Sequence, residues 1–249
     1  MSLIKTSQGP IWAEQHGDGP PLLLLHADGS SGLEFEPICE ELGQDFRVMC
    51  LDFPGCGRSP RRAFSPAYYK ENAKAARDLL DHWSPSRPSW IIGNGGGAIT
   101  ALWLALLKPD QVAGVVADSF DEFYDAASNE ELQAEPSKEL QAFWLRMNGE
   151  DWPLVIEELQ RVFANFAEQE RSVFDWRLEE VGCPVLLTGS RRDPIIPEAG
   201  KRKLAVVEQL KRGQLLLYPE GDHPTMWSQR ERFWPDALAF IASHQSTNP

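Results

Sequence analysis

Short apolar runs that alternate with helical segments constrain the fold of this chain more than any other feature of its sequence. Several of these runs are nearly all apolar, as is typical of strands covered on both faces of a parallel sheet. We predict strands at residues 11–14, 21–25, 46–51, 89–92, 112–117, 184–188 and 214–218. Strands and helices in this alternation indicate an α/β fold with a mostly parallel, doubly wound sheet.

One intervening segment has a clear helical pattern after Ser65 and Pro66, which we predict as its N-cap and first helical residue. Apolar side chains recur there at spacings of four and three and predict one buried stripe. The residues of this stripe are Tyr69, Ala73, Ala76, Leu80 and Trp83.

The alternation stops between residues 119 and 177, where no strand pattern is found. This segment is acidic and rich in aromatic residues, and residues 140–144 and 155–166 have helical spacing. We therefore predict a helical cap at residues 119–177 that is inserted into a core of residues 1–118 and 178–249. We expect the cap to lie over the ends of the strands.

Composition excludes several classes of partner. The chain has 249 residues, with 24 Lys plus Arg against 37 Asp plus Glu, and its net charge of -13 would repel nucleic acid and anionic lipid surfaces. No apolar stretch approaches the roughly 20 residues of a membrane-spanning helix, and the N-terminal residues lack a signal-peptide pattern. We expect a cytoplasmic protein, monomeric or homodimeric. The four cysteines contain no CxxC pair, so neither a metal site nor a disulfide framework is predicted.

The predicted strand at residues 89–92 leads into the glycine-rich run GNGGGA, residues 93–98, and then into an apolar helix. A strand, a tight turn and a helix in this order can present a nucleophilic side chain when small residues flank it two positions away. Gly93 and Gly97 hold the flanking positions, but the central residue is Gly95. Glycine has no side chain that can attack a carbonyl group.

Further motifs follow the other predicted strands: HADGSSG at 26–32, LDFPGCGRS at 51–59, GSRRDPIIP at 189–197 and GDHP at 221–224. Ligands of open α/β sheets bind at these strand ends. With these motifs in this order, the chain resembles the alpha/beta-hydrolase family. It is most similar to the biphenyl-hydrolase-like group, which includes valacyclovir hydrolase. The resemblance spans nearly the whole chain and is weakest in the predicted cap.

The resemblance implies a role for each motif. Gly95 stands at the nucleophile position, His223 would be the general base, and Asp193 would orient His223 and stabilise its cation. The backbone N–H groups of Asp28 and Gly96 would form the oxyanion hole. No metal or organic cofactor is implied, and the implied substrate is a small, largely apolar ester, thioester, lactone or amide.

Two departures from the family pattern limit what carries over. Valacyclovir hydrolase has an acidic residue directly after the nucleophile for the substrate amino group, whereas this chain has Gly96, so a preference for amino-acid esters does not carry over. Asp28 places a carboxylate near the expected oxyanion and is predicted to disfavour anionic substrates. We interpret His26 as structural and Cys56 as a turn residue, and we keep Asp118 as an alternative acid.

Four functional hypotheses remain open. The first is an ester-hydrolase scaffold whose serine is replaced by Gly95, either naturally or by a deliberate Ser-to-Gly change. The second is a protein that binds a small ligand without turnover. The third is a dinucleotide-dependent oxidoreductase, because GNGGGA fits the G-x-G-x-x-G/A fingerprint and Asp118 lies where a ribose-binding acid is expected. The fourth is non-hydrolytic base catalysis by His223 and Asp193.

Overall fold

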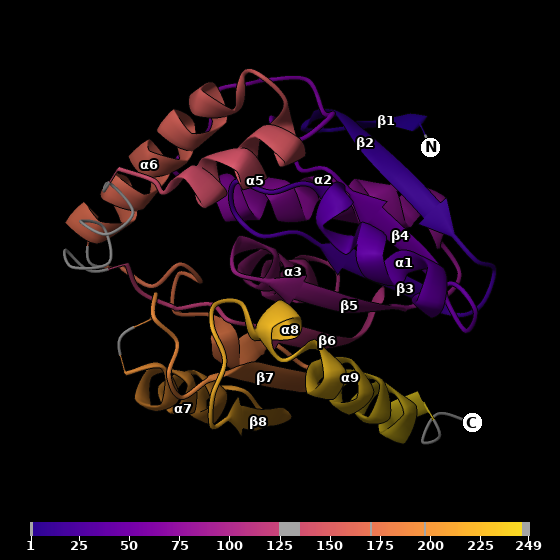
Figure 1. The fold of residues 1–249 in the computed structure, drawn as a ribbon. Helices are drawn as coiled ribbons and strands as arrows, with labels where there is room; N and C mark the ends of the chain where they lie inside the picture. The colour runs from indigo at the N-terminus through magenta and orange to yellow at the C-terminus, as the bar shows by residue number, and fades with distance from the viewer. Residues whose placement is uncertain (1, 125–134, 170, 197, 246–249) are drawn as a thin grey trace.

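A central sheet of eight strands organises the computed structural model, which describes residues 2–124, 135–169, 171–196 and 198–245 (Figure 1). The strands are β1 (Ser2–Thr6), β2 (Gly9–His16), β3 (Pro21–Leu25), β4 (Arg47–Leu51), β5 (Ser89–Asn94), β6 (Val112–Asp118), β7 (Val185–Ser190) and β8 (Gly213–Tyr218). Their order across the sheet is β1-β2-β4-β3-β5-β6-β7-β8. The six strands from β4 to β8 in this order are parallel. The predicted fold class is therefore confirmed.

The first two strands differ from the rest of the sheet. β1 pairs antiparallel with β2, and β2 pairs antiparallel with β4. The sequence analysis did not predict β1, because its sequence SLIKT is mostly exposed and contains no apolar run. Strand β2 buries alternate residues only, as is typical of antiparallel strands with one solvated face.

Alternate residues of the central strands supply the apolar cores on the two faces of the sheet. Leu23 and Leu25 face the layer that contains α2 (Tyr68–Trp83), α3 (Gly96–Leu107) and α7 (Ala199–Gln209). Leu22 and Leu24 face α1 (Glu36–Leu42) and α9 (Arg230–Gln245). The short elements η1 (Gly32–Phe35), η2 (Leu178–Glu180) and α8 (Thr225–Ser228) lie in the connections. The sheet is thus covered on both sides, which explains the continuous apolar runs.

Helix α2 buries most of the predicted stripe, with Tyr69, Ala73, Ala76 and Leu80 at 1% exposure or less. Its predicted start is wrong by two residues, because the helix begins at Tyr68 rather than Pro66. The Ser65 hydroxyl accepts a hydrogen bond from the Ala67 backbone N–H at 3.1 Å. Ser65 therefore forms a local turn before the helix instead of capping it.

Helices α5 (Lys138–Asn148) and α6 (Trp152–Gln169) project above the sheet at one end of the molecule (Figure 1). The described residues between 119 and 177 contain no strand, as expected from their sequence. Residues 125–134 and 170 of the predicted cap, and Pro197 of the GSRRDPIIP motif, lie outside the described residues. The division into core and cap stays a prediction.

Polar contacts join α5 and α6 to loops of the core. The Arg61 guanidinium donates to both Asp151 carboxylate oxygens at 2.8 Å and to the Gly57 carbonyl at 2.7 Å. The Asn148 side chain accepts from the Gly57 N–H and donates to the Gly29 carbonyl, both at 2.8 Å. These bonds hold the two helices over the carboxyl ends of β3 and β4.

Candidate active site

The turn between β5 and α3 forms the floor of the candidate site, and close packing explains two of its glycines. A Cβ atom on Gly93 would lie 2.5 Å from the Gly97 carbonyl group. A Cβ atom on Gly97 would lie 2.0 Å from the Leu25 carbonyl oxygen. Because both distances are far below van der Waals contact, only glycine fits at these positions.

Gly95 is different, because packing does not require a glycine there. An added Cβ atom would meet Ala27 Cβ at 3.6 Å, which is an ordinary contact. The backbone, however, has φ 51° and ψ -123°, a conformation that side-chain-bearing residues rarely adopt. The turn therefore has room for a side chain at position 95, at the expense of backbone strain.

His223 and Asp193 lie together although 30 residues separate them along the chain. His223 Nδ1 is 3.0 Å from Asp193 Oδ2, and the Asp193 carboxylate is fully buried. Asp193 Oδ1 accepts from the backbone N–H groups of Ile195 and Ile196 at 2.9 and 3.1 Å. When Nδ1 carries the proton donated to Asp193, Nε2 is left to accept a proton.

The surroundings of Asp193 keep it ionised. Burial by itself would raise the pKa of Asp193, but the hydrogen bond and charge of His223 and the two backbone donors outweigh burial and lower it. An ionised carboxylate beside Nδ1 fixes the orientation and tautomer of the imidazole. This arrangement agrees with the role that the family resemblance implies for Asp193.

Asp118 is held in a different network. Its Oδ1 accepts from the hydroxyl groups of Thr188, at 2.7 Å, and Thr225, and its Oδ2 accepts from the Met226 N–H at 2.9 Å. The residue is fully buried. Asp118 therefore fixes the start of α8, directly after His223 and Pro224, and no exposed carboxylate oxygen is left to orient the imidazole or to bind a ribose.

The Asp28 side chain lies against the first turn of α3. A Cβ atom on Gly96 would lie 2.1 Å from Asp28 Oδ1, so the carboxyl group occupies the space that a side chain at position 96 would take. The Tyr69 hydroxyl donates to Asp28 Oδ2 at 3.1 Å, and the Tyr124 hydroxyl lies 2.6 Å from that of Tyr69. Sequence analysis assigned Asp28 a role through its backbone N–H and missed this contact of its side chain.

Desolvation raises the pKa of Asp28 to about 7. Hydrogen bonds from the Tyr69 hydroxyl and the Gly96 backbone, together with the charge of His223, act in the opposite direction but are weaker. The pKa values of Asp193 and Asp28 are therefore shifted in opposite directions, with that of Asp193 lowered and that of Asp28 raised. Divergent environments of this kind are typical of groups with different roles.

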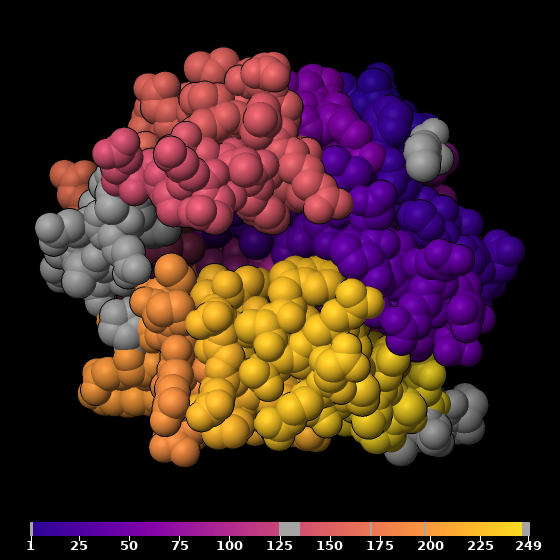
Figure 2. All heavy atoms as spheres, viewed as in Figure 1, coloured from indigo at the N-terminus to yellow at the C-terminus, as the bar shows by residue number. Residues whose placement is uncertain are grey.

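A cavity of about 440 Å³ joins these groups. Gly95, Asp28 and His223 line it, and most of its remaining wall is apolar and aromatic. The aromatic lining residues are Phe120, Phe123, Tyr124, Phe143, Trp144, Phe163 and Trp227. Figure 2 shows the hollow between the pink and salmon helices α5 and α6 and the orange and yellow C-terminal part of the chain. A small, largely apolar molecule fits such a cavity.

Leu140 and Phe143 of α5 are 40% and 38% exposed, although their spacing is that of a buried face. Both line the cavity. Their exposure follows from their position at the cavity, where an apolar wall faces the space for a ligand instead of a packed core.

Glu34 is a further side chain of the site that sequence analysis did not identify. Its Oε1 accepts from Asn94 Nδ2 at 2.6 Å and Trp227 Nε1 at 2.9 Å, and its Oε2 accepts from the Ala27 N–H at 3.1 Å. One buried carboxylate thus connects the loop after β3, the end of β5 and α8. No local sequence pattern signals a contact between three such distant segments.

His26 and Cys56 have structural surroundings. His26 is fully buried, accepts from the Phe53 N–H at 2.9 Å through Nε2 and contacts the Ala27 carbonyl at 2.8 Å through Nδ1. Burial lowers the pKa of His26 and raises that of the Cys56 thiol to about 12. A neutral thiol at this pKa is a poor nucleophile. Both residues fit the structural interpretation given to them above.

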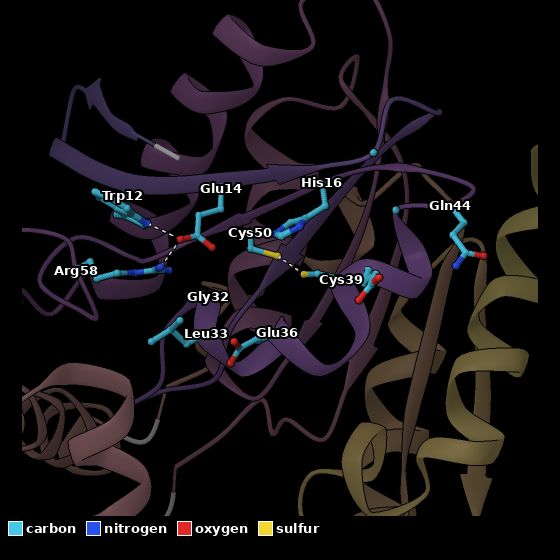
Figure 3. A pocket seen from close by; sticks show the side chains of 13 residues that line it. Trp12, Glu14, His16, Gly32, Leu33, Glu36, Cys39, Gln44, Cys50 and Arg58 are labelled. Carbon is cyan, nitrogen blue, oxygen red and sulfur yellow. Dashed lines mark hydrogen bonds and ion pairs between the residues drawn. The ribbon is translucent and has the colours of Figure 1, made fainter.

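A larger cavity, of about 790 Å³, lies beside β2 and α1 (Figure 3), and neither His223 nor Asp193 is among its lining residues. On one side Glu14 lies between Trp12 and Arg58, and its Oε1 accepts from Trp12 Nε1 at 3.0 Å. On the other side the thiols of Cys39 and Cys50 lie 3.2 Å apart. The smaller cavity is the candidate active site, because the His223 imidazole that lines it is paired with the Asp193 carboxylate.

Two further properties concern the described residues only. Among them, no cluster of three or more His, Cys, Asp or Glu side chains is arranged to hold a metal ion. None of their helices combines the length and the apolar character that crossing a bilayer requires.

Residues 20–147 match the family model of the alpha/beta hydrolase fold. A solved structure of a hydrolase from Pseudomonas aeruginosa PA01 superimposes with a TM-score of 0.74 at 21% identity, covering 96% of this chain and 97% of that one. At this identity the likeness shows the fold alone.

Similar sequences come from several bacteria and from mouse. RutD of Pseudomonas syringae pv. syringae (strain B728a), which is named as a carbamate hydrolase, is 27% identical over 92% of this chain and 96% of its own length. The mouse (Mus musculus) serine hydrolase BPHL is 27% identical over 83% of this chain and 74% of its length. A match of 37% identity to the magnesium-chelatase 30 kDa subunit of Rhodobacter capsulatus covers 48% of this chain and only 43% of that protein.

Proposed function

The chain belongs to the alpha/beta hydrolase fold family, and we propose that it hydrolyses an ester-type bond of a small, largely apolar substrate without a covalent intermediate. Water, rather than a side chain at position 95, is the nucleophile. His223 is the general base, Asp193 orients it, and Gly95 provides the surface over which the water and the carbonyl carbon meet.

In this reaction His223 Nε2 takes a proton from the water as its oxygen bonds to the carbonyl carbon. The protonated imidazole is stabilised by the Asp193 carboxylate. It then returns the proton to the leaving alcohol when the tetrahedral intermediate collapses. Water and ester thus yield an acid and an alcohol, and neither an oxidant nor a cofactor is needed.

This proposal rests on the 3.0 Å contact between His223 Nδ1 and Asp193 Oδ2, beside a cavity whose floor includes Gly95. Base-assisted attack by water requires an oriented imidazole, an apolar cavity and space at position 95. The hydrolase names of several relatives agree with this class of reaction. The aromatic lining supports an aryl or other apolar group on the substrate.

Hydrolysis of small aryl esters tests the proposal. We expect the unaltered protein to accelerate hydrolysis by more than about 10³ to 10⁴ over water, because binding and the oxyanion hole alone give that rate in sites without a working triad and the His223 base adds to it. His223→Ala removes the base and should lower kcat/KM by about 10²-fold. Asp222→Asn, at an exposed neighbouring residue, is the matched control and should leave the rate unchanged. Equal rates for His223→Ala and the unaltered protein would contradict the proposal.

Replacement of Gly95 tests the space at the floor of the site. Gly95→Ser adds a hydroxyl group where a Cβ atom makes only ordinary contacts, and we expect it to raise aryl-ester hydrolysis by roughly 10²-fold with a burst of acyl-enzyme. Gly95→Ala imposes the same backbone strain without the hydroxyl and should show no burst. A burst from neither variant would mean that the base does not reach position 95.

A second candidate function is reversible binding of a ligand without turnover. The absence of a nucleophilic side chain at position 95 favours it, together with the Asp28 carboxyl group against Gly96. Calorimetry with a non-hydrolysable ester analogue distinguishes the two. Binding that is unchanged in His223→Ala, in a protein without measurable turnover, would select the binding function over hydrolysis.

A further inference from the structure

The cavity is lined by an acidic group, Asp28, that the proposed mechanism has not used. Asp193 accepts three hydrogen bonds and lies behind His223. Asp28 instead lines the cavity itself, together with Gly95 and His223. An imidazole and a carboxyl group therefore reach the same turn from two different loops, one after β8 and one after β3.

The carboxyl group of Asp28 is fixed at a position where charge develops during ester hydrolysis. It lies over Gly96 at the start of α3, and its Oδ2 accepts from the Tyr69 hydroxyl at 3.1 Å. Backbone N–H groups at such a helix start stabilise negative charge on a substrate oxygen in acyl transfer. Here Asp28 itself accepts a hydrogen bond from the Gly96 backbone, so a substrate oxygen must share or replace this contact.

We propose that Asp28, in its protonated form, is a further catalytic residue that donates a hydrogen bond to the carbonyl oxygen of the substrate. This inference rests on the hydrolysis proposed above. An ionised Asp28 would repel the developing oxyanion, whereas the protonated carboxyl group supplies a donor in a desolvated place, where hydrogen bonds to charge are strong.

Few neighbouring groups can change the protonation state of Asp28 near pH 7. The ionisable side chains that face it are Tyr68 and Tyr69 from α2, Tyr124, Cys56 after β4 and His223 after β8. Burial holds the pKa of each of the three tyrosines well above its usual value, and that of Cys56 rises to about 12, so these four stay neutral near pH 7.

Two other acidic side chains, Glu34 and Asp121, line the same cavity and have their own partners. Glu34 accepts hydrogen bonds from Asn94, Trp227 and Ala27, and Asp121 forms an ion pair with Arg202. Asp28, with a pKa of about 7, is thus a group of the cavity whose charge changes near neutral pH.

The step balances without a further reactant. His223 takes a proton from water, the water oxygen bonds to the carbonyl carbon, and the π electrons move to the carbonyl oxygen, which the Asp28 proton stabilises. Collapse of the intermediate reforms the carbonyl bond and expels the alcohol oxygen with the proton from His223. Asp28 ends the cycle with its proton.

The dependence of kcat/KM on pH tests this role. Because the acid form of Asp28 is the active one, activity of the unaltered protein should fall tenfold per pH unit above about pH 7. Asp28→Asn keeps an N–H donor that cannot ionise, so its activity should not fall between pH 7 and 9. Asp28→Ala removes the donor and should be lowered about 10²-fold at pH 6.

A falling alkaline limb that persists in Asp28→Asn would overturn the proposal. So would higher activity of both Asp28 variants at every pH, because Asp28 would then be an obstruction. If His223→Ala hydrolysed the ester as fast as the unaltered protein, the hydrolytic function itself would be overturned. The two failures are therefore distinguishable. Infrared titration of the unaltered protein adds a measurement that needs no variant, because a carboxylic acid band must disappear with a midpoint near pH 7. Absence of that band also contradicts the role.

Discussion

At the scale of single residues, positions 28 and 96 are linked. The Asp28 carboxyl group fits over α3 only because Gly96 has no side chain, and a Cβ atom there would lie 2.1 Å from Oδ1. Gly95 has no comparable restriction, because its added Cβ atom meets only Ala27. Packing therefore explains Gly93, Gly96 and Gly97 in the GNGGGA run, whereas packing leaves room for a side chain at position 95.

Asp28 should also make stability depend on pH. The folded protein holds the Asp28 proton up to about pH 7, whereas the unfolded chain releases it near the ordinary value of 3.8. Stability from this group is therefore fully present below pH 3.8 and is lost as the pH rises to about 7. We expect urea unfolding to show that the free energy of unfolding of Asp28→Asn, relative to that of the unaltered protein, increases by on the order of 2 kcal/mol as the pH rises from about 5 to about 8.

The control for that measurement is Asp222→Asn, whose exposed side chain should leave the pH dependence as it is. If the free energies of unfolding of Asp28→Asn and the unaltered protein changed in parallel over the same pH range, Asp28 would not titrate there.

At the scale of elements, the turn between β5 and α3 depends on close approach of three backbones. Gly97 in the first turn of α3 touches the end of β3, and Gly93 at the end of β5 touches Gly97. The helix start, the floor of the cavity and the central strands are thus positioned by one contact. A disturbance of this contact should affect both folding and catalysis.

Gly97→Ala tests that contact. An added Cβ atom would lie 2.0 Å from the Leu25 carbonyl oxygen, so we expect the free energy of unfolding to fall by about 3 kcal/mol. Gly182→Ala is the matched control, because no atom lies within 4 Å of its added Cβ, and it should change stability by less than about 0.5 kcal/mol. Thermal unfolding compares the two, and similar Tm values would show that the turn can adjust.

At the scale of the whole molecule, α5 and α6 cover the cavity, and polar contacts that include those of Glu158 with Phe64 and of Arg146 with Glu36 join them to the core. Arg61 and Asn148 provide the contacts to Gly57, Gly29 and Asp151. Since Trp144 of α5 and Phe163 of α6 line the cavity, the position of these helices determines the shape of the binding space.

Arg61→Ala should loosen this attachment. We expect KM for aryl esters to rise by about tenfold, with a smaller change in kcat, because the walls that bind the substrate move while His223 and Asp193 stay in place. Limited proteolysis should cleave α5 or α6 faster in this variant. Arg62→Ala, which removes an ion pair to Glu71 in the core, is the control. If KM and the rate of proteolysis were the same in Arg61→Ala as in the unaltered protein, apolar packing rather than Arg61 would hold α5 and α6 on the core.

The sequence predicts the parts of this structure that depend on local patterns. The parallel strands follow from their apolar runs, and the motifs at 189–197 and 221–224 point to Asp193 and His223 as candidates through the family resemblance that they carry. Strand β1 was missed because an exposed edge strand has no apolar run. The contacts of Asp28 with Tyr69 and Gly96 were also missed, because three separate segments meet there and no spacing in the chain relates them.

The network around Asp118 has a consequence for the ancestry and redesign of the chain. Hydrogen bonds hold the segment that carries His223 to the end of β6. The Thr225 hydroxyl and the Met226 N–H donate to Asp118, and the Thr225 N–H donates to the Ser119 hydroxyl at 3.0 Å. A C-terminal segment transplanted from a homologue would place its imidazole correctly only if compatible residues at 118 and 119 came with it. Substitutions at these distant positions should therefore be inherited together.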